Sequence, residues 1–304
     1  MVVFTSFGVF LAVFEVVFHQ NLHFYNDGYA FFSLTNYFGF GKTVMNAVMT
    51  LYPGMYSVTI SMLAVQFMYR YWVLFSLHYM IYFRGWKLLL WVLYCSFFGG
   101  TWSIAAYFCL QTDTSSENYF HEEMFSGYNI LTEKHPLLIF LAYDPITKNL
   151  KAVAVLYSML TLLIMGIQYS TMIYCSWMMH TKMEEKIANF SNSLKHHHRQ
   201  MFKTLVLQIS TPTIFLFTPI FLVLNVPYLQ LQISVPAGAT FCLFSIYPAI
   251  DSIIILSVIS EYRSAAKRLL RAGLLKIIAI HSFESVNSQT EQIQMSTVSR
   301  ATVQ

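Results

Sequence analysis

Charged side chains are scarce in this sequence. Asp, Glu, Lys and Arg make up 11% of the 304 residues, whereas hydrophobic residues make up 56%. Soluble globular domains carry about 25% charged residues, so the shortage excludes an ordinary soluble domain and indicates an integral membrane protein. The formal net charge of +4 predicts no nucleic-acid site, because the cations lie in short loops between apolar segments rather than on a water-exposed face.

Cysteine is also rare, and motifs for catalysis and for phosphate or metal binding are missing. The four cysteines lie in or beside apolar segments, which excludes a disulfide framework and a zinc site. The chain has no Gly-rich phosphate loop, no His-Glu-x-x-His motif and no Gly-x-Ser-x-Gly motif. We therefore predict that the chain is not an enzyme and uses no cofactor or metal.

Long apolar segments dominate the sequence instead. A transmembrane helix needs about 20 mostly apolar residues. Six segments qualify: Met1 to Phe18, Thr43 to Tyr69, Lys87 to Leu110, Ala152 to Met179, Met201 to Val226 and Gln232 to Ser260. The sequence therefore predicts an all-α membrane protein, a polytopic bundle of six transmembrane helices over residues 1–271. The Ser-, Thr- and Gln-rich residues 272–304 are expected to form a largely disordered cytoplasmic tail.

The cations are distributed unevenly among the connections between these segments. Fourteen of the 18 Lys and Arg residues follow the second, fourth and sixth segments. The positive-inside rule predicts that these connections and the C-terminus are cytoplasmic. Six crossings would then place Met1 in the cytoplasm as well, although no cation precedes the first segment. We therefore expect that a preceding helix is missing from this chain.

Two ionisable residues in the apolar segments are candidates for a switch. Asp251 lies three residues after Pro248, and a lone carboxylate in hydrocarbon is costly, so it is expected to face other helices. It either changes partners when the bundle rearranges or holds two helices together. Tyr69 and Arg70 end the second segment, where Arg70 either anchors the topology by reaching the interface or holds a neighbouring helix.

A second group of residues is expected in the outer half of the bundle. Glu15 and His19 are four residues apart, so they share a helix face and can pair, either inside an outer pocket or at the lipid edge. A small-molecule cavity needs a mostly apolar lining with few polar groups. The candidates for that lining are Met49, Tyr52, Trp102, Tyr107, Phe221 and Asn225.

Three stretches carry a family resemblance. They are Gln66 to Tyr71 with its Tyr-Arg pair, His198 to Gln208 followed by Pro212 and Pro219, and Tyr247 to Asp251 followed by Glu261-Tyr262-Arg263. They resemble the third, sixth and seventh helices of nematode serpentine chemoreceptors of the Str class. The first segment then corresponds to the second helix of that family, and Ser252 stands where the family has proline.

The resemblance implies a G-protein-coupled receptor for environmental chemicals in the plasma membrane, in sensory-neuron cilia. A small odorant would bind in the outer half of the bundle within the lipid bilayer. A heterotrimeric G protein would bind at the cytoplasmic face. The resemblance assigns the switch and coupling roles to Tyr69, Arg70, Pro248, Asp251, Tyr262 and Arg263.

Two alternatives remain open from the sequence. A channel or transporter subunit would also be polytopic, although no filter loop, regular Arg series or internal repeat is visible. A receptor that lacks its first helix would be a nonfunctional truncated product if the exposed packing surfaces caused its retention and degradation.

Overall fold

The computed structural model describes residues 2–35, 37–133, 135–187, 207–258, 263–264, 268 and 271. The chain divides into two units, residues 1–251 and 252–304, and the first contains the features described below. Its elements are α1 (Val2–Phe18), β1 (Gln20–Tyr25), β2 (Gly28–Ser33), α2 (Lys42–Phe75), η1 (Leu77–Phe83), η2 (Gly85–Lys87), α3 (Leu88–Cys109), α4 (Thr114–Tyr128), β3 (Leu137–Leu141), α5 (Ala152–Ile187), η3 (Thr213–Phe217), α7 (Thr218–Asn225), η4 (Val226–Leu229), β4 (Ser234–Pro236) and α8 (Ala239–Val258), of which the last continues into the second unit.

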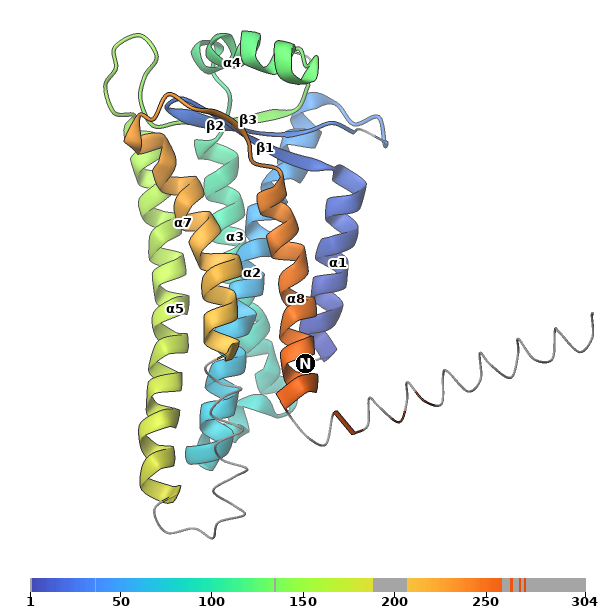
Figure 1. The fold of residues 1–304 in the computed structure, drawn as a ribbon, viewed down its shortest axis with the longest axis vertical. Coiled ribbons are helices and arrows are strands. Elements are labelled where there is room, and N and C mark those ends of the chain that lie inside the picture. Colours follow the sequence, from blue (N-terminus) through green and yellow to red (C-terminus); the bar gives the residue numbers. More distant parts are fainter. Residues whose placement is uncertain are drawn as a thin grey trace, which may run out of the picture. The chain divides into compact units, whose positions relative to one another are not determined.

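Helices occupy the six predicted apolar segments where the structure describes them (Figure 1), except at the start of the sixth, where Ser234–Pro236 form β4 and the helix begins only at Ala239. Four helices are long and apolar enough to cross a membrane: Lys42–Phe75, Gly85–Cys109, Ala152–Lys182 and Leu207–Leu229. Val3–Phe18 and Ala239–Asp251 are shorter apolar helices. The count of six crossings therefore stays a prediction. The predicted tail, residues 272–304, lies outside the described residues.

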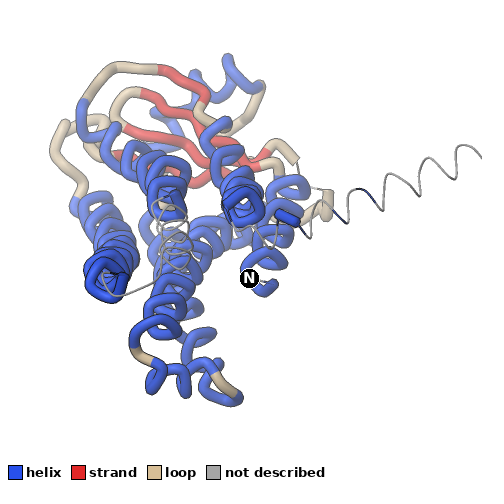
Figure 2. The backbone as a smooth tube through the Cα atoms, turned by 60° about the horizontal axis from the view of Figure 1, so that its bottom comes forward, coloured by secondary structure: helices blue, strands red, loops and turns tan. Residues whose placement is uncertain are grey.

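The expectation of an all-α chain is wrong at one end of the bundle. Four antiparallel strands form a sheet there in the order β3-β2-β1-β4 (Figures 1 and 2). Strands β1 and β2 form a hairpin in which Tyr25 pairs with Gly28, so Asn26 and Asp27 make the two-residue turn. Asn26 has a φ of 46°, the left-handed conformation that such tight hairpins require.

The sheet lies between the helix bundle and α4, and its strands β2 and β3 are buried at every position, whereas the edge strand β4 is exposed. In β2, Tyr29 and Phe31 belong to the core of the bundle, whereas Ala30 and Phe32 pack with Phe120 of α4. Neighbouring residues of a strand point to opposite faces. Because both faces are apolar, the sequence lacks the alternation of a half-exposed strand. We call the sheet together with α4 the cap.

Helix α4 is fastened to the rest of the chain by caps and ion pairs. Asp113 is its N-cap and accepts a hydrogen bond from the Ser116 amide at 2.7 Å. Lys42, at the start of α2, contacts Glu117 at 2.7 Å, and Lys151 contacts Asp113 at 3.3 Å. Two carboxylates of the acidic connection between α3 and α5 thus pair with Lys42 of α2 and with Lys151, the residue before α5.

Helix α2 crosses α3 at very short range because both helices have glycine at the crossing. A methyl group on Gly54 would collide with Ser103, and one on Gly99 would lie 3.0 Å from the Gly54 carbonyl oxygen. Small residues at a crossing let two membrane helices approach until their backbones touch. Helix α2 is consequently central in the bundle, and it carries residues of both parts of the candidate site.

Candidate functional site

A cavity of about 60 Å³ lies beneath the cap. Phe31 of β2 contributes to its lining from the sheet, together with Leu22 and Tyr29. The helices supply the walls, with Tyr52 and Tyr56 from α2, Trp102 from α3, Tyr157 from α5, Val223 from α7, and Phe241 and Phe244 from α8. Segments from the whole length of the first unit therefore meet around one apolar space.

Four polar side chains of this lining bond to the protein itself. The Tyr52 hydroxyl donates to the Glu15 carboxylate at 2.6 Å, and the Tyr56 hydroxyl donates to the backbone carbonyl of Leu216 at 2.7 Å. The Trp102 indole N–H donates to the Tyr157 hydroxyl at 3.1 Å. These bonds leave aromatic and aliphatic carbon as the surface that the cavity presents.

The structure places only some of the eight residues that the sequence predicted for ligand binding at the cavity. Tyr52 and Trp102 line the cavity, and Glu15 contacts it through Tyr52. Met49 is fully buried in the core, and Tyr107 is half-buried with its ring against Phe108.

The remaining three of these eight residues lie elsewhere. Phe221 is 53% exposed, and the Asn225 side chain donates to the Phe221 carbonyl at 2.7 Å. His19 follows the end of α1 with a φ of 38°, which takes it off the helix, and its ring packs edge-on against Tyr37. The His19 N–H still bonds the Glu15 carbonyl at 2.9 Å, and pairing of the two side chains stays a prediction.

A polar relay joins three helices at the opposite end of the bundle, which we call the Arg70 end. The Arg70 guanidinium donates to the Gln208 side-chain oxygen, and the Gln208 amide nitrogen lies 3.5 Å from the Asp251 carboxylate. Gln208 and Asp251 are buried, at 3% and 5% exposure. Two opposite charges thus share one uncharged bridge inside the bundle, and this agrees with the expectation that Asp251 faces other helices.

The other predicted switch residues have separate surroundings. Tyr69 is 44% exposed and packs edge-on against Phe83. Pro248 contacts α1, because a methyl group on Gly8 would lie 3.1 Å from the proline ring. Arg263 is helical and exposed in the second unit, and Tyr262 lies outside the described residues.

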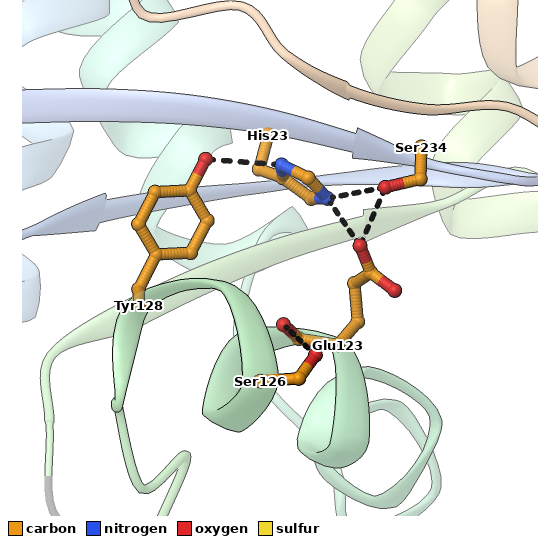
Figure 3. Close-up of polar contacts among 5 residues, drawn as sticks. All are labelled: His23, Glu123, Ser126, Tyr128 and Ser234. Carbon is orange, nitrogen blue, oxygen red and sulfur yellow. Dashed lines mark hydrogen bonds and ion pairs between the residues drawn. The ribbon is translucent and has the colours of Figure 1, made fainter.

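A polar cluster fastens α4 to the sheet, and we call it the latch (Figure 3). Its centre is His23 of β1, whose ring nitrogens lie 3.1 Å from the Tyr128 hydroxyl and 3.1 Å from the Glu123 carboxylate. The Ser234 hydroxyl of β4 donates to the same carboxylate at 2.5 Å. Burial and the charge of Glu123 raise the pKa of Tyr128, so this phenol stays neutral.

Sequence reasoning missed several of these residues. Tyr56, Tyr157 and Phe244 resemble any other aromatic residue of an apolar helix, and no spacing singles them out. Gln208 was one letter of a family motif without an assigned role. The hairpin did have a signal, because Asn26-Asp27-Gly28 between two aromatic stretches is a typical tight turn.

Comparison with known proteins identifies the family. The model of the serpentine type 7TM GPCR chemoreceptor Str family matches residues 1–267. The chain is 39% identical over 274 residues to G-protein coupled receptor str-33 of Caenorhabditis elegans, covering 88% of this chain and 79% of that protein. The chain belongs to the Str family of serpentine chemoreceptors.

More distant relatives agree with this membership. The chain is 24% identical to serpentine receptor class r-10 of Caenorhabditis elegans over 267 residues, and 24% identical to serpentine receptor class r-10 of Caenorhabditis briggsae over 268 residues. Each match covers 86% of this chain and 78% of the relative. No solved structure matches the chain significantly. The Str chain is thus a multi-pass membrane protein whose family signals through G proteins.

Proposed function

We propose that this Str chain is an odorant receptor that binds a small uncharged molecule beneath the cap and signals to a heterotrimeric G protein at the Arg70 end. The observation that carries the proposal is that three helices each contribute residues to both sites. They are α2, the helix Leu207–Leu229 and α8. Helix α2 carries Tyr52 and Tyr56 in the cavity and Arg70 in the relay. Helix α8 carries Phe244 in the cavity and Asp251 in the relay.

The cavity indicates the chemistry of the ligand. A charged ligand would lose its hydration and find no charge of opposite sign among the lining residues, which costs several kcal/mol. The cavity is small, at about 60 Å³, and its lining is mostly apolar, so it suits a small uncharged molecule. Many volatile odorants are small uncharged molecules, which fits the sense of smell.

The receptor is oriented with the cap outside the cell and the Arg70 end in the cytoplasm. This orientation follows the cations, because the connections after α2 and α5 and the C-terminal segment carry most of the Lys and Arg residues. The C-terminus is then cytoplasmic, and the membrane of sensory-neuron cilia is the place where an odorant would reach the cap first.

The relay is the element with two states. In the described state Arg70 is held by Gln208, so its charge is not presented to a partner. A ligand that binds more tightly to a second arrangement of the bundle raises the population of that arrangement. Separation of Gln208 from Arg70 would expose the guanidinium next to Tyr69, while the coupling roles of Pro248, Tyr262 and Arg263 stay predictions.

A pair of neighbouring substitutions in α7 tests the ligand site. Val223 lines the cavity, whereas Leu222 is 52% exposed beside it. Val223→Phe places extra volume in the cavity and is expected to lower the odorant response at least tenfold, while Leu222→Phe places the same ring outside and leaves the response unchanged. The measurement is nucleotide exchange by a G protein with the receptor in bilayers, across a panel of uncharged volatile molecules.

Two results of this assay would contradict the proposal. An equal loss of response in both variants would show that ring volume in the cavity is not what matters. A response restricted to charged molecules would show that the ligand binds at a different place.

A further inference from the structure

The helix Leu207–Leu229 lies in the fifth apolar segment and corresponds to the sixth helix of the Str family, so we call it the sixth span; it is irregular in the middle of its length. It is α-helical at residues 207–212, becomes the π-helical turn η3 at Thr213–Phe217, and continues as α7. Pro212 precedes this turn and Pro219 follows it. Prolines and π turns disturb the regular pairing of carbonyls with amides, so some carbonyls of such a turn accept bonds from outside the helix.

Tyr56 supplies one such bond from α2. Its hydroxyl donates to the Leu216 carbonyl in η3 at 2.7 Å, and both residues are buried. Its ring is also part of the cavity lining, where it packs against Trp102 at a centroid distance of 5.8 Å and Phe244 at 4.6 Å. One side chain therefore faces the ligand space with its ring and holds the π turn with its hydroxyl.

The same span reaches the relay at its other end. Gln208 lies eight residues before Leu216, which is about 12 Å along a helix. Gln208 and Leu216 lie on one continuous helical span, so a shift of η3 away from α2 is expected to move Gln208 relative to Arg70 as well. The bond from Tyr56 to Leu216 and the bond from Arg70 to Gln208 thus join the same two helices at two heights.

We infer that Tyr56 is a positioning residue that couples the occupancy of the cavity to the state of the Arg70 relay. In the empty receptor its hydroxyl holds η3 against α2 and so keeps Gln208 on Arg70. A molecule in the cavity displaces the Tyr56 ring, the hydroxyl leaves the Leu216 carbonyl, and the sixth span separates from α2. The part of this inference that concerns signalling rests on the proposed receptor function. The part that concerns movement of the helices does not depend on that function.

Tyr56→Phe tests the inference, because the variant keeps the ring and removes the hydroxyl. Tyr94→Phe is the matched control, since the Tyr94 hydroxyl bonds Gln168 at 2.8 Å between α3 and α5, away from the sixth span. Spin labels at Val73 of α2 and Leu207 of the sixth span, with the four native cysteines replaced by alanine, report the helix separation without ligand or G protein. Loss of one hydrogen bond is expected to raise the population of the wider distance roughly fivefold in Tyr56→Phe and to leave it unchanged in Tyr94→Phe.

A second measurement is nucleotide exchange by the G protein without added odorant. We expect it to rise by a similar factor in Tyr56→Phe and to stay at the wild-type level in Tyr94→Phe. The inference is overturned if the label distances of Tyr56→Phe match those of the wild type, or if both variants change alike. If the wild-type receptor supports no nucleotide exchange under any condition, that result contradicts the proposed function. The distances between the spin labels still decide the role of Tyr56 in that case.

Discussion

The cap and the Arg70 end hold their segments together by different means. In the cap, apolar packing and the latch join the sheet to α4, and the Lys42 and Lys151 ion pairs join α4 to α2 and to the residue before α5. At the Arg70 end, α2, the sixth span and α8 share the relay through Gln208. The difference indicates that the cap is the rigid frame of the receptor and that the Arg70 end is the part that rearranges.

The energies of the two regions support this difference. Full burial of one aromatic or aliphatic side chain contributes about 1.5–3 kcal/mol, and the cap buries many of them on two faces. One hydrogen bond contributes about 0.5–1.5 kcal/mol net. Breaking the relay therefore costs little if Arg70 and Asp251 find new partners, whereas opening the cap would expose Phe32, Phe120 and their neighbours to water.

The largest expected effect is on the stability of the cap. Phe32 is fully buried between β2 and α4, so Phe32→Ala should lower the free energy of unfolding by about 3–5 kcal/mol. Thermal unfolding in detergent or bilayers, together with proteolysis at α4, measures the loss. Phe38→Ala is the control, because Phe38 is 60% exposed and its truncation should cost much less. If the two variants lost similar amounts of unfolding free energy, the packing of the cap would not be what stabilises it.

The next largest effect is expected at the relay. Gln208→Met keeps the length of the side chain and removes both polar contacts with Arg70 and Asp251. We expect nucleotide exchange without odorant to rise roughly fivefold to tenfold, with a smaller loss of thermal stability than in Phe32→Ala. A variant that signals at the wild-type level without odorant would show that Gln208 does not hold the resting state.

The latch should give a smaller and local effect. Glu123→Gln removes the charge that accepts bonds from His23 and Ser234, so β4 should open more often. Hydrogen exchange of the β4 amides should become roughly fivefold faster, which corresponds to about 1 kcal/mol. Glu122→Gln alters the exposed neighbouring carboxylate and should leave these amides unchanged. Equal exchange in both variants would mean that the latch adds nothing to strand pairing.

The smallest expected effect concerns the start of α4. Burial acts to raise the pKa of Asp113, but the hydrogen bonds from Ser116 and the charge of Lys151 together lower it below the ordinary value. A lowered pKa in the folded state means that this carboxylate stabilises α4 above its unfolded pKa of about 3.9 and loses that contribution as the pH falls through the folded pKa. Asp113→Ala should therefore cost about 1 kcal/mol at pH 7. The difference from the wild type should vanish at strongly acidic pH in a melting series, and a difference that grew on acidification would contradict the assignment.

The membrane class and the helices followed from the sequence because a bilayer imposes a strong and local requirement. Any segment that crosses it must be apolar and helical for its whole length. Asp251 could be singled out for the same reason, since a buried carboxylate violates that pattern and must have a partner. Its link to Arg70 through Gln208 joins residues far apart in the chain, which no local pattern reveals.

The cap and the cavity were less accessible to sequence reasoning. A strand such as Leu137–Leu141 is apolar at every position because it is buried on both faces, so it has no period of two to recognise. The cavity depends on which aromatic rings of five segments turn toward one another. The composition predicted that aromatic residues would line the cavity. It could not show that Tyr56 lines the cavity whereas Phe221 lies outside it.

The most direct test of the account compares movement at the two ends of the receptor in bilayers. One pair of spin labels, at Val73 and Leu207, reports the Arg70 end, and a second pair, at Ser126 of α4 and Val235 of β4, reports the cap. When a heterotrimeric G protein is added and its nucleotide removed, we expect the distance at the Arg70 end to lengthen and the distance in the cap to stay the same. A changed cap distance with an unchanged distance between Val73 and Leu207 would contradict the account.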